Sequence, residues 1–230
     1  MASENSERLR QFHARVAGFT FLFYIAAGIS NMILFSRATA GEGTAAKLAS
    51  IAAHTPEMGA SIILDLLCCF SALVLAVSLY AITRDEGRSL AMMGFACRLG
   101  EGVIGAAGLP KTLGLLWLAT AGADGPDAAT VNTLGTFLLI PAGSSTLSAT
   151  FFAVGSTVFS YLLLRGRMVP VALAWLGVVA SAVLVVELPL QLARFLEGPV
   201  TSYIWIPMAV FEIALAFWLL IKGVAPRPAA

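Results

Sequence analysis

The chain has 230 residues, of which 59% are hydrophobic and 12% are charged, and its formal net charge is +1. Soluble domains carry about 25% charged residues, and a soluble protein of this length has too much surface for so few polar side chains. The composition therefore excludes an ordinary soluble protein and favours a lipid environment, and the small net charge provides no field that would attract nucleic acid.

The first apolar run covers 16–35 and follows the segment 1–15, which carries Arg8, Arg10 and Arg15. Ala38-Thr39-Ala40 behind it resembles a signal-peptide cleavage site, but the apolar core of a signal peptide has about 7–15 residues. This run is longer, and further apolar runs follow it. We therefore predict a retained transmembrane helix over 16–35, preceded by a cytoplasmic segment at 1–15.

The second predicted helix covers 58–82, and the third begins at 90 and reaches at least 109, with the apolar pattern resuming beyond Pro110 up to 121. A straight helix over 90–121 would be roughly 45–50 Å long, which exceeds a hydrocarbon core of about 30 Å. Either the helix kinks at Pro110 and projects beyond the lipid, or its second part lies at the interface. The kink is favoured because proline removes a backbone hydrogen bond and clashes one turn back.

Three further helices are predicted over 145–164, 169–192 and 203–221, followed by a cytoplasmic tail at 223–230. Between the third and fourth helices, Asp127–Leu139 has the pattern of a short amphipathic or partly re-entrant piece that ends at Pro141. The sequence leaves the structure of 110–144 open.

The basic residues predict the orientation of the helices. If six helices alternate, one side of the membrane receives Arg8, Arg10, Arg15, Arg84, Arg88, Arg165, Arg167, Lys222 and Arg227. The other side receives Arg37, Lys47, Lys111 and Arg194. Because cytoplasmic loops carry an excess of Lys and Arg, both termini are expected in the cytoplasm. The predicted fold is an all-α polytopic membrane helix bundle, with six transmembrane helices in one domain over 16–222.

Ionisable residues inside these apolar runs are the main functional signal. Arg98 and Glu101 lie in the third helix, and Asp65, Glu187 and Glu212 lie in other helices. Each costs roughly 2.5–3.5 kcal/mol on insertion scales, so such groups are expected to face one another rather than lipid. Counting 1.5 Å per residue places them between the midplane and the outer leaflet.

Helical spacing indicates which of these polar side chains share a face. Arg98 and Glu101 are three residues apart and are therefore neighbours on one helix. Glu187, Gln191 and Arg194 recur at i, i+4 and i+7 on one face of the fifth helix. Asn31, near the outer end of the first helix, is placed to join them. The candidate binding residues are Asn31, Asp65, Arg98, Glu101, Glu187, Gln191, Arg194 and Glu212.

Several stretches resemble a family of small bacterial membrane proteins known as Domain of Unknown Function 4386. The matching pieces are Arg15-Val16-Ala17-Gly18, Phe95-Ala96-Cys97-Arg98-Leu99-Gly100-Glu101, Leu164–Pro170, Leu173–Gly177 and Phe211–Gly223. Together they sample nearly the whole chain in the family's order. The resemblance implies an integral membrane protein with several helices and supplies no established activity. It carries over the charged pattern at Arg98, Glu101 and Glu212, but not Asp65, Glu187 or Arg194, and it does not place Thr83–Arg88.

Metal and cofactor chemistry is not expected. His13 precedes the first helix and His54 lies in the first outer loop, so neither can bind a metal or haem within the membrane. No glycine-rich phosphate loop is present. Cys68, Cys69 and Cys97 fall within apolar runs, where cysteine normally behaves as a small hydrophobic residue.

Three interpretations of the polar cluster remain open. The charges can serve only to pair helices, although such pairing is often not net stabilising. They can form a pocket that binds a lipid-soluble ligand, or moves a proton or small solute. They can also belong to an enzyme in which Glu101, Glu212 or Asp65 acts as general acid on an isoprenoid or other lipid.

We take binding of a small hydrophobic molecule or lipid as the working hypothesis. The expected location is the bacterial inner (plasma) membrane, as a multi-pass protein. The expected partners are membrane lipids and a hydrophobic small molecule, with association into a homo-oligomer left open and no nucleic acid. No catalytic residue is assigned beyond the three acids of the enzyme interpretation.

Overall fold

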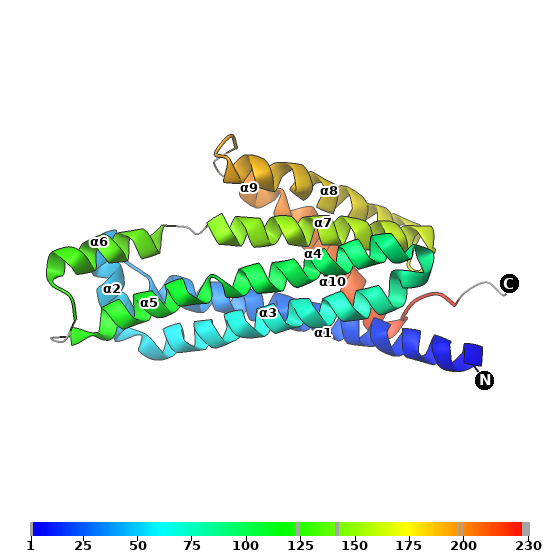
Figure 1. The fold of residues 1–230 in the computed structure, drawn as a ribbon, viewed down its shortest axis with the longest axis horizontal. Helices are drawn as coiled ribbons and strands as arrows, with labels where there is room; N and C mark the ends of the chain where they lie inside the picture. Colours follow the sequence, from blue (N-terminus) through cyan, green and yellow to red (C-terminus); the bar gives the residue numbers. More distant parts are fainter. Residues whose placement is uncertain (1, 123–124, 141–142, 197, 199, 227–230) are drawn as a thin grey trace.

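The computed structural model describes residues 2–122, 125–140, 143–196, 198 and 200–226 (Figure 1). Every regular element in this part of the chain is a helix, and several of the helices are long and apolar. The predicted fold class, an all-α membrane helix bundle, is confirmed. The three cysteines are free.

Six helices form the bundle: α1 (Ala2–Ala38), α3 (Thr55–Thr83), α4 (Arg88–Ala106), α7 (Gly143–Arg165), α8 (Val171–Leu192) and α10 (Trp205–Ile221). α1 packs against α3 and α10, α4 against α3 and α7, and α8 against α7 and α10. A short 3₁₀ helix, η1 (Arg84–Glu86), joins α3 to α4. Both termini lie at one end of the bundle, together with the α3–α4 and α7–α8 turns (Figure 1).

Five helical segments are long and apolar enough to cross a membrane: 4–38, 55–86, 88–120, 145–165 and 171–192. α10 is apolar too, but it has 17 residues. That length is about the lower limit for crossing the hydrocarbon core. α10 nevertheless packs within the bundle on α1 and α8. The crossing by α10, and with it the count of six, stays a prediction.

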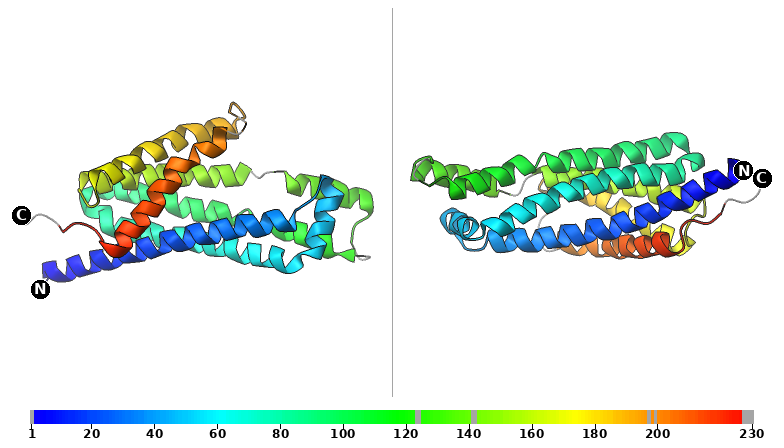
Figure 2. Two further views of the ribbon diagram at one scale, coloured as in Figure 1. Left: turned by 180° about the vertical axis from the view of Figure 1, so that it is seen from behind. Right: turned by 90° about the horizontal axis from the view of Figure 1, so that it is seen from below.

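Three shorter helices lie at the end of the bundle opposite the termini: α2 (Gly43–Ala53), α5 (Leu109–Thr120) and α6 (Ala128–Leu139) (Figures 1 and 2). They pack on one another, and we call them the cap. The cap has an apolar core separate from that of the bundle, formed by Ala38, Leu48, Ile51, Met58, Leu115 and Leu118. The described part of 110–144 is therefore mostly helical. The sequence reading missed α2, whose buried Leu48 and Ile51 lie three residues apart in a short, alanine-rich segment.

The third predicted helix is interrupted one turn before its proline. α4 ends at Ala106, and α5 begins at Leu109, with Pro110 in its first turn. Proline is tolerated there because the first N–H groups of a helix have no intrahelical partner. Its ring would clash with the carbonyl group four residues earlier, which belongs to Ala106. This clash disfavours a continuous helix through Pro110 and explains why α4 ends at Ala106. Pro141, the predicted end of the 127–139 piece, lies outside the described residues.

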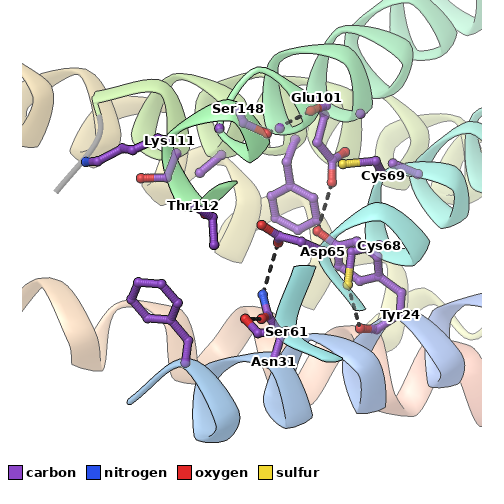
Figure 3. Close-up of a pocket in the computed structure, with 18 of the residues that line it drawn as sticks. Tyr24, Asn31, Ser61, Asp65, Cys68, Cys69, Glu101, Lys111, Thr112 and Ser148 are labelled. Atoms are coloured by element: carbon purple, nitrogen blue, oxygen red, sulfur yellow. Dashed lines mark hydrogen bonds between the residues drawn. The ribbon is translucent and has the colours of Figure 1, made fainter. Parts of the chain in front are cut away.

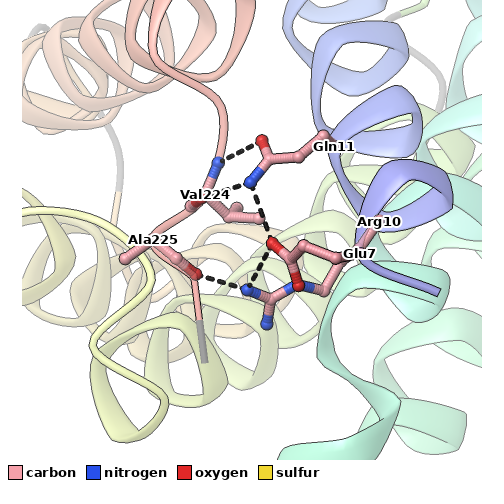
Figure 4. A network of polar contacts seen from close by, with 5 residues as sticks. All are labelled: Glu7, Arg10, Gln11, Val224 and Ala225. Carbon is pink, nitrogen blue, oxygen red and sulfur yellow. Dashed lines mark hydrogen bonds and ion pairs between the residues drawn. The ribbon is translucent and has the colours of Figure 1, made fainter. Parts of the chain in front are cut away.

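The segment 1–15 is not separate from the first helix, because α1 is continuous from Ala2. Part of the predicted tail is docked onto this helical extension (Figure 4). The Gln11 side chain donates to the Val224 carbonyl at 2.6 Å and accepts from the Val224 amide at 3.2 Å. Arg10 donates to the Ala225 carbonyl, and the Ala225 amide donates to Met168 in the α7–α8 turn at 2.9 Å. These bonds hold the two ends of the chain together.

Candidate functional site

A cavity of about 630 Å³ lies between the cap and the bundle. Side chains from α1, α3, α4, α7 and α10 line its inner part, and side chains from α2, α5 and α6 line its outer part. Figure 3 shows part of this lining, including Tyr24, Asp65, Glu101 and Lys111. Along α1 the lining extends from Tyr24 to Phe35, a length of about 16 Å at 1.5 Å per residue, and its inner end reaches the predicted charged cluster.

The inner end contains an ion pair on α4. Arg98 Nη1 lies 2.9 Å from Glu101 Oε2, as their spacing of three residues predicted. The Tyr24 hydroxyl donates to Glu101 Oε1 at 3.1 Å. The Arg98 guanidinium also lies over the rings of Phe152 and Phe21, at 4.9 Å and 5.8 Å from their centroids. Arg98 is 0% exposed and is not part of the cavity lining, and its charge acts on both Glu101 and Glu212.

Glu212 enters the same end of the cavity from α10. Its side chain is 7% exposed and contributes to the lining. Its Oε1 atom is buried without a hydrogen-bond partner among the described residues. Glu101 thus has an ion pair and a hydroxyl donor, whereas this oxygen of Glu212 has neither.

The middle of the cavity carries a second polar group, formed by Asn31, Ser61 and Asp65. Asn31 Nδ2 donates to Asp65 Oδ1 at 3.0 Å, and the Ser61 hydroxyl donates to Asn31 Oδ1 (Figure 3). These bonds connect α1 to α3. Asp65 is partly exposed within the cavity, and the partner shown for its carboxylate is a neutral amide.

Two cationic side chains line the outer part of the cavity. Lys47 comes from α2 and Lys111 from α5, and the Lys111 ammonium group donates to the Ile140 carbonyl. Lys111 is ten residues beyond Glu101 along α4 and α5, which corresponds to about 15 Å. The cations and the carboxylates therefore lie toward opposite ends of the cavity.

The predicted group on α8 is not part of this cavity. Glu187 is 3% exposed, and neither of its carboxylate oxygens has a hydrogen-bond partner among the described residues. Arg194 is exposed and lies beyond the last residue of α8, Leu192, with a φ of 60°. Arg194 therefore does not share a helix face with Glu187, because α8 ends before it. Glu187, Gln191 and Arg194 are absent from the lining because α8 packs on α7 and α10, away from α1, α3 and α4.

Sequence reasoning missed several polar residues that line the cavity. Tyr24 lies seven residues before Asn31, and Ser61 lies four residues before Asp65, so each shares a helix face with a predicted residue. Ser148 donates its hydroxyl to the Glu101 carbonyl at 2.8 Å and fastens α7 to α4. The spacing could have indicated Tyr24 and Ser61. Nothing in the sequence indicated Lys47 or Lys111, because their helices belong to the cap.

The described residues contain no grouping of three or more His, Cys, Asp or Glu side chains that could hold a metal ion. The chemistry available at the inner end is that of carboxyl groups, one phenol and the thiols of Cys68 and Cys69 (Figure 3). In a wall that is otherwise largely apolar, they can pair with a charge or exchange hydrogen bonds with a ligand.

Comparison with known proteins found one match. The family model described as Domain of unknown function (DUF4386) matches residues 16–223, which is most of the chain and includes Arg98, Glu101 and Glu212. No curated protein and no solved structure matches. The chain therefore belongs to the DUF4386 family of proteins.

Proposed function

We propose that this membrane protein binds a small hydrophobic molecule or a lipid in the cavity between the cap and the bundle. The observation that carries the proposal is the cavity of about 630 Å³ that ends at buried Glu101 and Glu212. Ligand pockets typically enclose about 300–1,000 Å³ and combine apolar walls with a few polar groups. Ionisable residues inside a membrane usually mark such sites.

The proposed setting is the bacterial inner membrane, with both termini in the cytoplasm and the cap outside. Support comes from the cations of the described residues. The start of α1, η1, the start of α4, the α7–α8 turn and the end of α10 lie at the end that holds the termini (Figure 1). These segments carry Arg8, Arg10, Arg15, Arg84, Arg88, Arg165, Arg167 and Lys222. Because Lys and Arg are enriched in cytoplasmic segments, this end is expected to face the cytoplasm. The cavity would then be nearer the outer surface.

A purely structural role is favoured for one part of the cluster. Arg98 and Glu101 neutralise each other, and the Tyr24 hydroxyl bonds to the same carboxylate. This arrangement joins α1 to α4 without any ligand. Helix packing therefore explains Arg98, which pairs with Glu101 on its own helix and lies over Phe21 and Phe152 of two others. It does not explain the cavity, or the Glu212 oxygen that has no partner among the described residues.

Native mass spectrometry of protein purified in mild detergent tests the proposal. We expect a bound species of defined mass in the wild type and its loss in Gly105→Leu, because Gly105 lines the cavity and its side chain would fill it. Gly28→Leu is the matched control, since a Cβ atom at Gly28 meets nothing within 4 Å. A wild type without any adduct, or equal occupancy in Gly105→Leu, would contradict binding in this cavity.

A further inference from the structure

We propose that the ligand of this cavity is an organic cation with an apolar body, and that its positive charge lies at the inner end beside Glu212. The inference rests on the proposed binding function and specifies the chemical class of the ligand. It follows from the balance of charges around the cavity, from the position of Arg98 and from the aromatic side chains at the inner end.

The acids at the inner end and middle of the cavity outnumber the cations. Glu212, Glu101 and Asp65 line it there, and Arg98 is the one cation that contacts this group among the described residues. Arg98 pairs with Glu101 and also acts electrostatically on Glu212, so one cation serves two acids, and the partner shown for Asp65 is an amide. An ionised carboxylate without a partner is costly in an interior of low dielectric, and a bound cation removes much of that cost. This surplus of acids fits a positively charged ligand group near Glu212.

An anionic ligand finds no equivalent partner at the inner end. The Arg98 guanidinium is fully buried, lies between Glu101 and two phenylalanine rings, and is not exposed to the cavity. Lys47 and Lys111 line the outer part, and Lys111 lies about 15 Å from Glu101 by helix rise along α4 and α5. A ligand whose charged group reaches the inner end is therefore repelled if it is negative and attracted if it is positive.

Aromatic side chains reinforce the preference. Tyr24, Phe152 and Trp205 line the cavity near its inner end. The Phe152 ring lies against Arg98 and stacks on Trp205, with the two ring centroids 6.0 Å apart, so the rings that remain for a ligand are those of Tyr24 and Trp205. Aromatic faces attract organic cations, most strongly where water is excluded. They also offer an apolar surface to the body of the ligand. Carboxylates and aromatic rings together are a suitable lining for a lipophilic cation.

Three probes of similar size separate the charge of the ligand from its hydrophobicity: tetraphenylphosphonium (cationic), triphenylphosphine oxide (neutral) and tetraphenylborate (anionic). Binding is measured by equilibrium dialysis with full-length protein in phosphatidylcholine nanodiscs, and the uptake by empty nanodiscs is subtracted. We expect the wild type to bind the cation at least tenfold more tightly than the neutral probe, and the anion more weakly than either.

Two variants locate the charge. Glu212→Gln should reduce cation binding at least tenfold and leave binding of the neutral probe within twofold, which also shows that the variant is folded. Glu187→Gln is the matched control, because it neutralises a buried acid outside the cavity and should bind the cation as the wild type does. If Glu212→Gln fails to fold, Asp65→Asn is the second test, with at least threefold weaker cation binding expected.

Equal binding of neutral and cationic probes, or unchanged cation binding in Glu212→Gln, would overturn the charge preference while leaving the cavity as a binding site. Failure of every probe would also overturn it. The proposed function has its own test, because native mass spectrometry shows whether a bound species is present in the wild type and absent in Gly105→Leu.

Discussion

The hydroxyl group of Tyr24 on α1 donates a hydrogen bond to the carboxylate of Glu101 on α4, at 3.1 Å, while Arg98 pairs with the same carboxylate at 2.9 Å. One acid thus satisfies a cation on its own helix and a phenol on another. The arrangement fixes the inner end of the cavity, and it separates the roles of the two glutamates. Glu101 is held by protein groups, whereas Glu212 lines the cavity and its Oε1 atom is buried without a hydrogen-bond partner among the described residues.

Replacing Arg98 by Met should destabilise the protein strongly. The substitution leaves Glu101 buried without its cation, and removal of one partner of a buried pair typically costs about 3–5 kcal/mol. The double variant Arg98→Met/Glu101→Gln should recover most of the loss, because the pair is then replaced by groups of similar size. Reversible unfolding in mixed detergent micelles measures both. A single variant that unfolds like the wild type would show that the pair contributes nothing to folding.

Replacing Tyr24 by Phe should have a smaller effect. It removes one interhelical hydrogen bond, and such bonds in membrane proteins contribute about 0.6 kcal/mol on average and about 1.7 kcal/mol at most. We therefore expect a loss near 1 kcal/mol in the same unfolding measurement. Tyr161→Phe, at a side chain that is 44% exposed on α7, is the control and should be neutral. Equal effects of the two variants would argue against a contribution from the bond to Glu101.

Gly18→Ala should weaken the packing of α1 on α10. A Cβ atom at this position would lie 2.6 Å from the Leu220 amide nitrogen and 2.7 Å from the Ala216 carbonyl oxygen, so the two helices would have to separate. We expect a loss of about 1–3 kcal/mol, the usual cost of overpacking. Gly28→Ala on the same helix meets no neighbour within 4 Å and should be neutral or stabilising. Thermal unfolding of the two variants side by side decides between these effects.

The stability of the cap should depend on pH through Asp127, which is the N-cap residue of α6. Asp127 Oδ1 accepts from the Ala129 and Thr130 amides at 3.0 Å, and Oδ2 accepts from the Thr130 hydroxyl at 2.8 Å. The Thr130 backbone and side-chain hydrogen bonds are the main causes that lower the pKa of Asp127 from its ordinary value of 3.8. A lowered pKa in the folded state means that the stabilisation is present above about pH 4 and is lost as the pH falls through the folded value.

Hydrogen exchange of the α6 amides measures this effect. We expect faster exchange in α6 below pH 4, after correction for the intrinsic rate, and severalfold faster exchange at pH 7 in Asp127→Ala. The amides of α8 serve as the internal reference, since α8 packs on α7 and α10 rather than on the cap. Unchanged α6 protection in Asp127→Ala would mean that packing against α5 holds the helix without its cap.

Much of the site could be predicted from the sequence because its members obey helical spacing. Arg98 and Glu101 pair as their three-residue separation requires, and the family pattern that contains them also contains Glu212. Asn31 and Asp65 meet on neighbouring helices. The structure does not bring Glu187, Gln191 and Arg194 to this cavity, because depth in the membrane does not determine the direction in which a helix face points.

The cap shows a different kind of limit. Apolar periodicity identifies long segments that cross lipid, but α2, α5 and α6 have 11 or 12 residues and bury few side chains each. Their core forms only when the ends of α1 and α3 contribute Ala38 and Met58. When a short helix packs against segments that are distant in the chain, the spacing of its own apolar residues gives little indication of that packing.

Local composition, and the cost of placing charge in hydrocarbon, were enough to predict a membrane protein, an all-α fold and the positions where charge interrupts apolar helices. Three features became known only from the folded chain: which charges meet, that both oxygens of Glu101 have partners in Arg98 and Tyr24 whereas Glu212 Oε1 has none among the described residues, and that a cavity lies beside them between the cap and the bundle. Those outcomes depend on how helices rotate and pack against one another, and contacts between distant segments are not encoded in the spacing of residues along any single helix.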